Sequence, residues 1–165
     1  KDNDSTPTPH QHNNRIDYLK LKLQKEFKYR KFGLENTFLY QKALSGEEVI
    51  KLPSFITRNT LYFEDQWFKK ALFMQTGLTF KYYSEYMMNA YDPVLAEFYV
   101  QDETELGGYP QFDIFFNARV QQVRIYFKYE NLNALFTDSN NYFSAPGYPF
   151  RDSVIRFGIV WNFLM

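Results

Sequence analysis

Two histidines separated by one residue, His10 and His12, are the first candidates for chemistry in this 165-residue chain. Such a pair could bind a metal ion, or supply the base of a Ser-His-Asp triad. It lies in a polar stretch, residues 1–14, which contains two prolines and no large apolar side chain. We interpret this stretch as a flexible loop or tail. We therefore expect no metal site, no catalytic residues and no enzymatic activity.

Acidic pairs are the next candidates. Glu47-Glu48, and Asp102-Glu103 with Glu105, could bind Ca²⁺, but none has the Asp-x-Asp-x-Asp-Gly spacing of a calcium loop. Gly107-Gly108 is not followed by the Lys-Ser/Thr of a phosphate-binding loop, and the chain contains no cysteine. We interpret these stretches as solvated loops and expect no cofactor.

Most of the remaining charged side chains alternate with large apolar ones. Leu19, Leu21 and Leu23 alternate with Lys20 and Lys22, a period of two that predicts a strand, since at helical spacing the leucines would scatter around the axis. This strand spans about a dozen residues. Its length is typical of a strand that crosses a membrane in a barrel, which needs about 9–11 residues.

The same alternation predicts seven strands. They cover residues 16–29, 34–43, 54–65, 70–84, 111–119, 123–130 and 152–163. The connections alternate between short and long, an arrangement typical of transmembrane barrels with short periplasmic turns and long extracellular loops. The fold class that we predict is therefore an all-β transmembrane antiparallel barrel, of which this chain is a part, with its C-terminus in the periplasm.

Each strand has one apolar, aromatic face and one polar face. In a soluble barrel the apolar face would fill a core, whereas in an outer-membrane barrel it faces lipid, and the pattern alone is the same for both. Aromatic residues near the strand ends, such as Tyr29, Trp67 and Trp161, favour the membrane. The alternative is a soluble barrel that binds a hydrophobic ligand. Its interior would contain Leu19, Leu21, Phe80, Ile159 and Trp161.

The polar face is the candidate functional site, as the lining of a lumen. The predicted lining residues are Lys20, Lys22, Glu26, Lys28, Arg58, Glu64, Lys81, Asp113, Arg119, Arg124, Lys128, Glu130 and Arg156. Nine of them are basic and four acidic. Because rings of charge select ions by sign, a modest anion preference is one hypothesis. The other is that these charges neutralise each other and only hydrate the wall.

The last strand carries a further pattern. Arg156, Gly158, Trp161 and Phe163 follow the order of polar residue, glycine and two spaced aromatics. This order resembles the C-terminal β-signal by which the outer-membrane assembly machinery recognises the last strand of a barrel. Leu164 and Met165 extend past the usual terminal aromatic. The resemblance implies the assembly machinery as a partner.

A wider resemblance covers roughly residues 30–165. It is carried by the stretches RNTLYF (58–63), AYDPVLAEFYVQ (90–101), ELGGYP (105–110), NYFSAP (141–146) and RFGIVWNF (156–163). In these the chain resembles the C-terminal portion of the β-barrel porins of the Bacteroidetes outer membrane. The resemblance implies an outer-membrane channel or channel-like barrel. It implies longer relatives with further strands on the N-terminal side, and no agreed catalytic residues.

The number of predicted strands agrees with a partial barrel. Seven is odd, whereas bacterial single-chain barrels usually have an even number of strands. We expect residues 15–165 to be the C-terminal strands of a porin-like channel for passive passage of small polar solutes. The alternative is a non-conducting barrel that serves as partner or client of an envelope assembly or secretion complex. Expected partners are outer-membrane lipid, the barrel assembly machinery and another envelope protein that completes or caps the barrel. Nucleic acid is not expected, because the net charge is zero.

The predicted loop over residues 85–110 is longer than a hairpin needs and is rich in aromatic residues. It could fold into the lumen as a constriction, bind a partner outside, or cap the barrel rim. The sequence does not rank these three roles.

Overall fold

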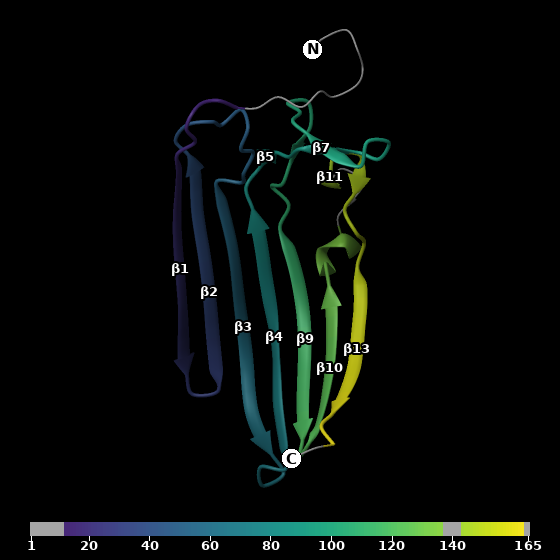
Figure 1. Cartoon of the computed structure of the whole chain (residues 1–165). Helices are drawn as coiled ribbons and strands as arrows, with labels where there is room; N and C mark the ends of the chain where they lie inside the picture. The colour runs from purple at the N-terminus through teal and green to yellow at the C-terminus, as the bar shows by residue number, and fades with distance from the viewer. Residues whose placement is uncertain (1–11, 137–142, 164–165) are drawn as a thin grey trace.

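One antiparallel sheet dominates the structure, a computed structural model that describes residues 12–136 and 143–163 (Figure 1). Seven strands form it within these ranges. In sheet order they are β1 (Tyr18–Tyr29), β2 (Phe32–Ala43), β3 (Phe55–Trp67), β4 (Leu72–Tyr83), β9 (Gln111–Val120), β10 (Val123–Glu130) and β13 (Val154–Trp161). Each pairs with the strands next to it along the chain. The prediction of seven long strands in an all-β fold is confirmed, with small shifts at the strand ends.

Short and long connections alternate along this sheet, as predicted. Residues 30–31, 68–71 and 121–122 form the short turns, which lie together at the lower end of Figure 1. The long loops lie at the upper end, as residues 44–54 and 84–110 and the described parts of the 131–153 loop, residues 131–136 and 143–153. Trp161 pairs with Val123, next to the last short turn, so β13 ends on the short-turn side.

The turn positions predicted from the sequence were partly wrong. The first turn was expected over residues 30–33, but Phe32 and Gly33 belong to β2, and only Arg30 and Lys31 connect the strands. Arg30 and Gln121 begin the two two-residue turns with φ angles of 56° and 51°. These left-handed conformations usually favour glycine or asparagine, so residue type gave no turn signal at either position. The turn at residues 121–122 was nevertheless predicted, because the alternation changes parity between the strands at 111–119 and 123–130.

The long loops contain short paired segments. Residues 84–110 contain β5 (Tyr86–Met87), β6 (Ala90–Asp92), β7 (Glu97–Tyr99) and β8 (Glu105–Leu106), paired as β5–β8 and β6–β7. Residues 131–153 contain the 3₁₀-helix η1 (Leu132–Leu135) and the paired segments β11 (Phe143–Ala145) and β12 (Tyr148–Pro149). The labelled segments β5, β7 and β11 lie at the upper end of the sheet in Figure 1. None of the helices among the described residues is long and apolar enough to cross a membrane.

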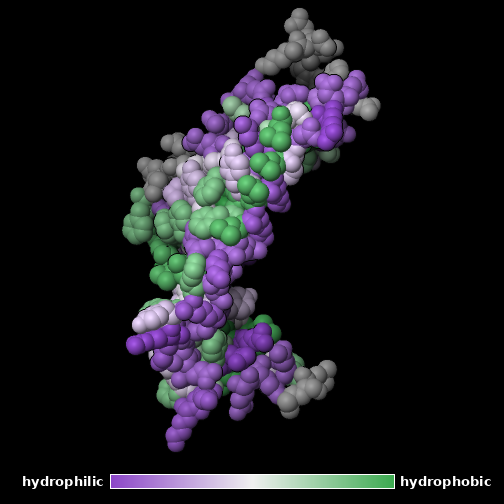
Figure 2. Space-filling model, turned by 90° about the vertical axis from the view of Figure 1, so that its left-hand side faces the viewer, coloured by the Kyte–Doolittle hydropathy of each residue, from purple (hydrophilic) through white to green (hydrophobic). Residues whose placement is uncertain are grey.

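The pairing register separates an apolar face from a polar face, because directly paired residues project to the same side of a sheet. One row of the apolar face crosses all seven strands. It consists of Phe27, Leu34, Leu61, Leu78, Ile114, Tyr129 and Ile155. Seen from the β1 side, the hydrophobic residues gather in the middle of the molecule, and the lower end is mainly hydrophilic (Figure 2). The apolar face is interrupted by one polar row, in which Lys25 pairs with Asn36 and Asn36 with Asn59.

Burial on these two faces is the reverse of that in a soluble protein. On the polar face, Asp113 is 1% exposed and Thr79 is 3% exposed. On the apolar face, Tyr29 is 71% exposed and Phe157 is 79% exposed. Large apolar side chains left uncovered over a whole sheet face mark a surface that another apolar phase or partner covers.

Three glycines of the polar face lie beneath aromatic rings of neighbouring strands. The ring of Tyr62 covers Gly33, that of Tyr126 covers Gly158, and that of Phe115 approaches Gly77. A Cβ on Gly158 would lie 2.6 Å from the Tyr126 ring. Glycine therefore allows each ring to lie against the sheet, a contact that also fixes register.

Replacing Gly33 with alanine tests this contact. We expect Gly33→Ala to destabilise the sheet by about 1–3 kcal/mol, because the added Cβ overlaps the Tyr62 ring. Urea unfolding in lipid vesicles, followed by tryptophan fluorescence, measures the change. In a Tyr62→Ala background the same substitution should cost much less. An equal cost in both backgrounds would contradict the ring contact as the reason for Gly33.

Candidate functional site

All thirteen residues predicted to line a lumen lie on the polar face. By strand they are Lys20, Lys22, Glu26 and Lys28 on β1, Arg58 and Glu64 on β3, Lys81 on β4, Asp113 and Arg119 on β9, Arg124, Lys128 and Glu130 on β10, and Arg156 on β13. The register thus brings them to one surface. Their contact with a water-filled lumen remains a prediction.

Asp113 is the centre of the larger ion-pair cluster. Its Oδ2 atom accepts a hydrogen bond from Lys81 Nζ at 2.5 Å and lies 3.1 Å from Lys128 Nζ. Its Oδ1 atom accepts the backbone N–H of Asn131 at 3.1 Å. Two ammonium groups and one peptide N–H compensate the desolvation of this carboxylate, which a buried charge requires.

Glu130 extends the cluster to the edge of the sheet. Lys128 Nζ donates to Glu130 Oε1 at 2.8 Å, and Arg156 Nε donates to Glu130 Oε2 at 2.9 Å. Lys128 therefore bridges two carboxylates, Asp113 and Glu130. The five side chains from Lys81 to Arg156 form one continuous network over β4, β9, β10 and β13.

A second, more exposed cluster lies on the β1 side. Lys28 Nζ is 3.6 Å from both Glu26 Oε1 and Glu64 Oε1, and the Tyr62 hydroxyl donates to Glu26 Oε1 at 2.5 Å. Gln75 donates to Glu64 at 3.4 Å. Because these ion pairs are solvent-accessible, each adds little stability. Together the two clusters engage all four predicted acidic residues.

Five basic residues of the polar face have no acidic partner within the described part of the chain. They are Lys20, Lys22, Arg58, Arg119 and Arg124. One further acid, Glu35, lies on the same face, directly opposite Glu26. The sequence prediction omitted it, although the alternation with Leu34 and Phe38 could have found it. With Glu35 included, the polar face has nine basic and five acidic residues.

Asn131 attaches the upper loops to this face. Its side chain accepts a hydrogen bond from the Tyr109 hydroxyl at 3.1 Å and donates to the backbone carbonyl of Arg151 at 2.8 Å. Its own N–H binds Asp113, and both Asn131 and Tyr109 are buried. One residue thus links the 84–110 loop, the 131–153 loop and the ion-pair network. Nothing in the sequence pattern singled it out.

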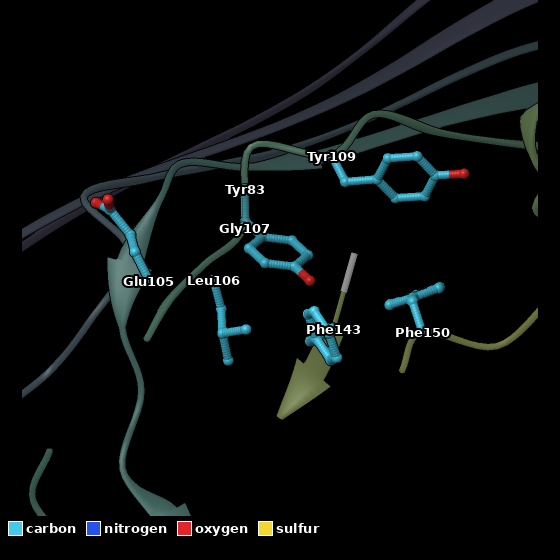
Figure 3. A pocket seen from close by; sticks show the side chains of 7 residues that line it. All are labelled: Tyr83, Glu105, Leu106, Gly107, Tyr109, Phe143 and Phe150. Atoms are coloured by element: carbon cyan, nitrogen blue, oxygen red, sulfur yellow. The ribbon is translucent and has the colours of Figure 1, made fainter. Parts of the chain in front are cut away.

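A small cavity lies where the two loops meet (Figure 3). Its volume is about 30 Å³, and it is lined by Tyr83, Glu105, Leu106, Gly107, Tyr109, Phe143 and Phe150. This space is on the scale of a single water molecule, so it is too small for a solute. We interpret it as a packing gap between loops.

The other candidates from the sequence do not assemble into a site. His12 Nδ1 lies 3.7 Å from Glu48 Oε1, while His10 lies outside the described residues. Asp102 pairs with Lys51 at 2.6 Å, which links the 84–110 loop to the 44–54 loop. Among residues 12–136 and 143–163, no group of three or more His, Asp or Glu side chains is arranged to hold a metal ion.

The residues of the predicted β-signal lie on or next to β13, which pairs with β10 and forms one edge of the sheet. Arg156 and Gly158 belong to the polar face. The rings of Trp161 and Phe163 are stacked with centroids 4.5 Å apart. This arrangement leaves the other hydrogen-bonding side of β13 without a partner in the described sheet. Its recognition by an assembly machinery remains a prediction.

The meander of long antiparallel strands has a polar face with buried residues at its centre and an apolar face that is uncovered, which is the architecture of a section of a β-barrel wall. The model of the family described as "Putative porin" matches residues 2–164. The chain therefore belongs to this porin family. No curated protein and no solved structure matches the chain.

Removing the Asp113 carboxylate should strongly destabilise the sheet. We expect Asp113→Ala to cost about 3 kcal/mol, because breaking a buried ion pair leaves its partners uncompensated. Urea unfolding in lipid vesicles measures this free energy. As a matched control, Glu35→Ala removes an exposed carboxylate without an ion-pair partner in the described residues, and should change stability by less than about 0.5 kcal/mol. Equal effects of the two substitutions would refute the central role of Asp113.

Proposed function

We propose that the chain is part of an outer-membrane channel of the porin type, through which small polar solutes pass without energy input. The observation that carries this proposal is the reversed burial of the two faces. Apolar side chains such as Leu23 and Phe27 are uncovered and would face lipid. The charged face would line a water-filled lumen, as in outer-membrane barrels.

The two edges of the sheet imply further strands. Within the described residues, β1 and β13 each have one hydrogen-bonding side without a partner. Unpaired backbone groups are not tolerated in lipid, so a membrane-spanning sheet of this kind must be closed. We propose that further strands, from the same protein or from another barrel, complete it. In this arrangement the long loops lie outside the cell, and the short turns and the C-terminus lie in the periplasm.

The ion pairs support a preference for anions. The four acidic residues in the two clusters are compensated by Lys28, Lys81, Lys128 and Arg156. The five basic residues without acidic partners outnumber the one unpaired acid, Glu35. Mutual neutralisation therefore accounts for only part of the charge on this face.

One observation favours the alternative of a non-conducting barrel that binds another envelope protein. The polar row Lys25–Asn36–Asn59 interrupts the apolar face, where polar groups are costly against lipid. The Lys25 side chain is exposed, so a protein partner could accept a hydrogen bond from it, whereas lipid chains cannot.

Ion selectivity tests the channel proposal directly. We expect stepwise conductance in a planar bilayer that contains the full-length protein and separates two concentrations of potassium chloride. The reversal potential should show a modest preference for chloride, because the basic residues of the wall are in excess. Absence of conductance would favour the partner alternative, and a preference for potassium would contradict the assignment of the polar face as the lining.

Adjacent residues on β1 test which face contacts lipid. Leu23→Arg places a charge at the middle of the strand on the apolar face and should cost about 2–4 kcal/mol in lipid. Gln24→Arg places the same side chain on the polar face and should cost less than about 0.5 kcal/mol. Folding yield into vesicles and urea unfolding give both values. The opposite ranking would indicate that the apolar face is an interior core.

A further inference from the structure

Arg119 and Arg124 form an unusual pair at the short-turn end of the polar face. Arg119 on β9 lies directly opposite Arg124 on β10 in the register, next to the turn at residues 121–122. Cross-strand neighbours of this kind have Cβ atoms about 4.5–5.5 Å apart, and like charges at this position are destabilising. No acidic side chain in the described residues forms an ion pair with either arginine.

The surroundings of the pair are aromatic on two sides. The Arg119 guanidinium lies 5.5 Å from the centroid of the Phe73 ring, its cross-strand neighbour on β4. Tyr126, two residues after Arg124, lies against Gly158 and so leaves the space above the sheet open. Together with Asn117, Ala118, Ile125 and Val160 these residues line an open recess of about 470 Å³. Its volume is within the range of small-molecule sites.

The other basic residues of the polar face do not form a directly paired couple of arginines without acidic partners. Lys20 and Lys22 also lack acidic partners, but they lie on one strand, β1, and carry ammonium groups. Lys81 and Lys128 are bound to Asp113, and Arg156 is bound to Glu130. Arg58 lies directly opposite Lys81, whose charge Asp113 already compensates. Among the described residues, two arginines without acidic partners therefore occupy directly paired positions at the short-turn end of β9 and β10.

We propose that Arg119 and Arg124 bind the anionic group of a small solute, a carboxylate or a phosphate, at the periplasmic mouth of the lumen. This inference rests on the proposed function, in which the polar face lines a channel. Guanidinium groups bind carboxylate and phosphate through paired, charge-assisted hydrogen bonds. A bound anion removes the repulsion between the two arginines, and Phe73 limits the positions that the Arg119 side chain adopts.

Binding of inorganic phosphate to the purified full-length protein in detergent is the first test, measured by the broadening of the ³¹P resonance. We expect saturable binding to the unmodified protein. The double variant Arg119→Gln with Arg124→Gln should weaken it about tenfold or more, because both charge-assisted hydrogen bonds to the anion are lost. The matched control, Lys69→Gln with Lys70→Gln, removes the same charge from the exposed 68–71 turn at the same end of the sheet and should change the affinity less than twofold.

Absence of saturable binding, or equal affinity in the double variant and the unmodified protein, would overturn the proposal. Micelles containing phosphatidylglycerol distinguish the source of the anion. If this lipid displaces phosphate from the unmodified protein, the site takes a headgroup, and the assignment to a solute is wrong.

Bilayer conductance separates this inference from the proposed function. We expect phosphate to reduce the chloride current of the unmodified channel, and to do so less in the double variant. Phosphate binding without any conductance would refute the channel but leave the anion site standing. Conductance that phosphate reduces equally in both proteins would refute the site but leave the channel standing.

Discussion

Backbone hydrogen bonds between neighbouring strands hold the described sheet in one register, and the two surfaces of the molecule depend on that register. Because side chains alternate along a strand, a slip of one residue would move Lys20, Arg58 or Arg124 to the apolar face. The observed pairing instead collects the charged residues on one side and a continuous apolar row on the other. Gly33 and Gly158, covered by the rings of Tyr62 and Tyr126, oppose such a slip, because only glycine leaves room for those rings.

Asp113 connects this register to the loops. Its carboxylate joins β9 to Lys81 on β4 and Lys128 on β10, and it also binds the N–H of Asn131, where the 131–153 loop begins. Asn131 in turn binds Tyr109 at the end of the 84–110 loop. The buried charge of Asp113 therefore helps to attach both the 84–110 loop and the start of the 131–153 loop to the polar face. This attachment places the 84–110 loop at the long-loop end of the sheet.

Membership of the porin family and the distribution of burial point in the same direction. A sheet with one charged face and an uncovered apolar face is unfavourable in water, yet it is the arrangement that a lipid bilayer stabilises. The charges of the polar face are only partly compensated. The surplus lies on Lys20, Lys22, Arg58, Arg119 and Arg124, and at the short-turn end two of these arginines are adjacent. A channel of this composition would attract anions and bind them at one mouth.

The sequence alone determined the strands, their two faces and the alternation of short and long connections. These features depend on a period of two that is visible within each segment, so all thirteen predicted polar-face residues lie on one face. Only the tertiary structure decided which charges pair. Asp113 contacts Lys81 and Lys128 through the relative register of three strands, and Asn131 contacts Tyr109 from 22 residues away. The left-handed backbone of Arg30 and Gln121 also required the structure, because neighbouring strands, rather than local residue preference, impose it.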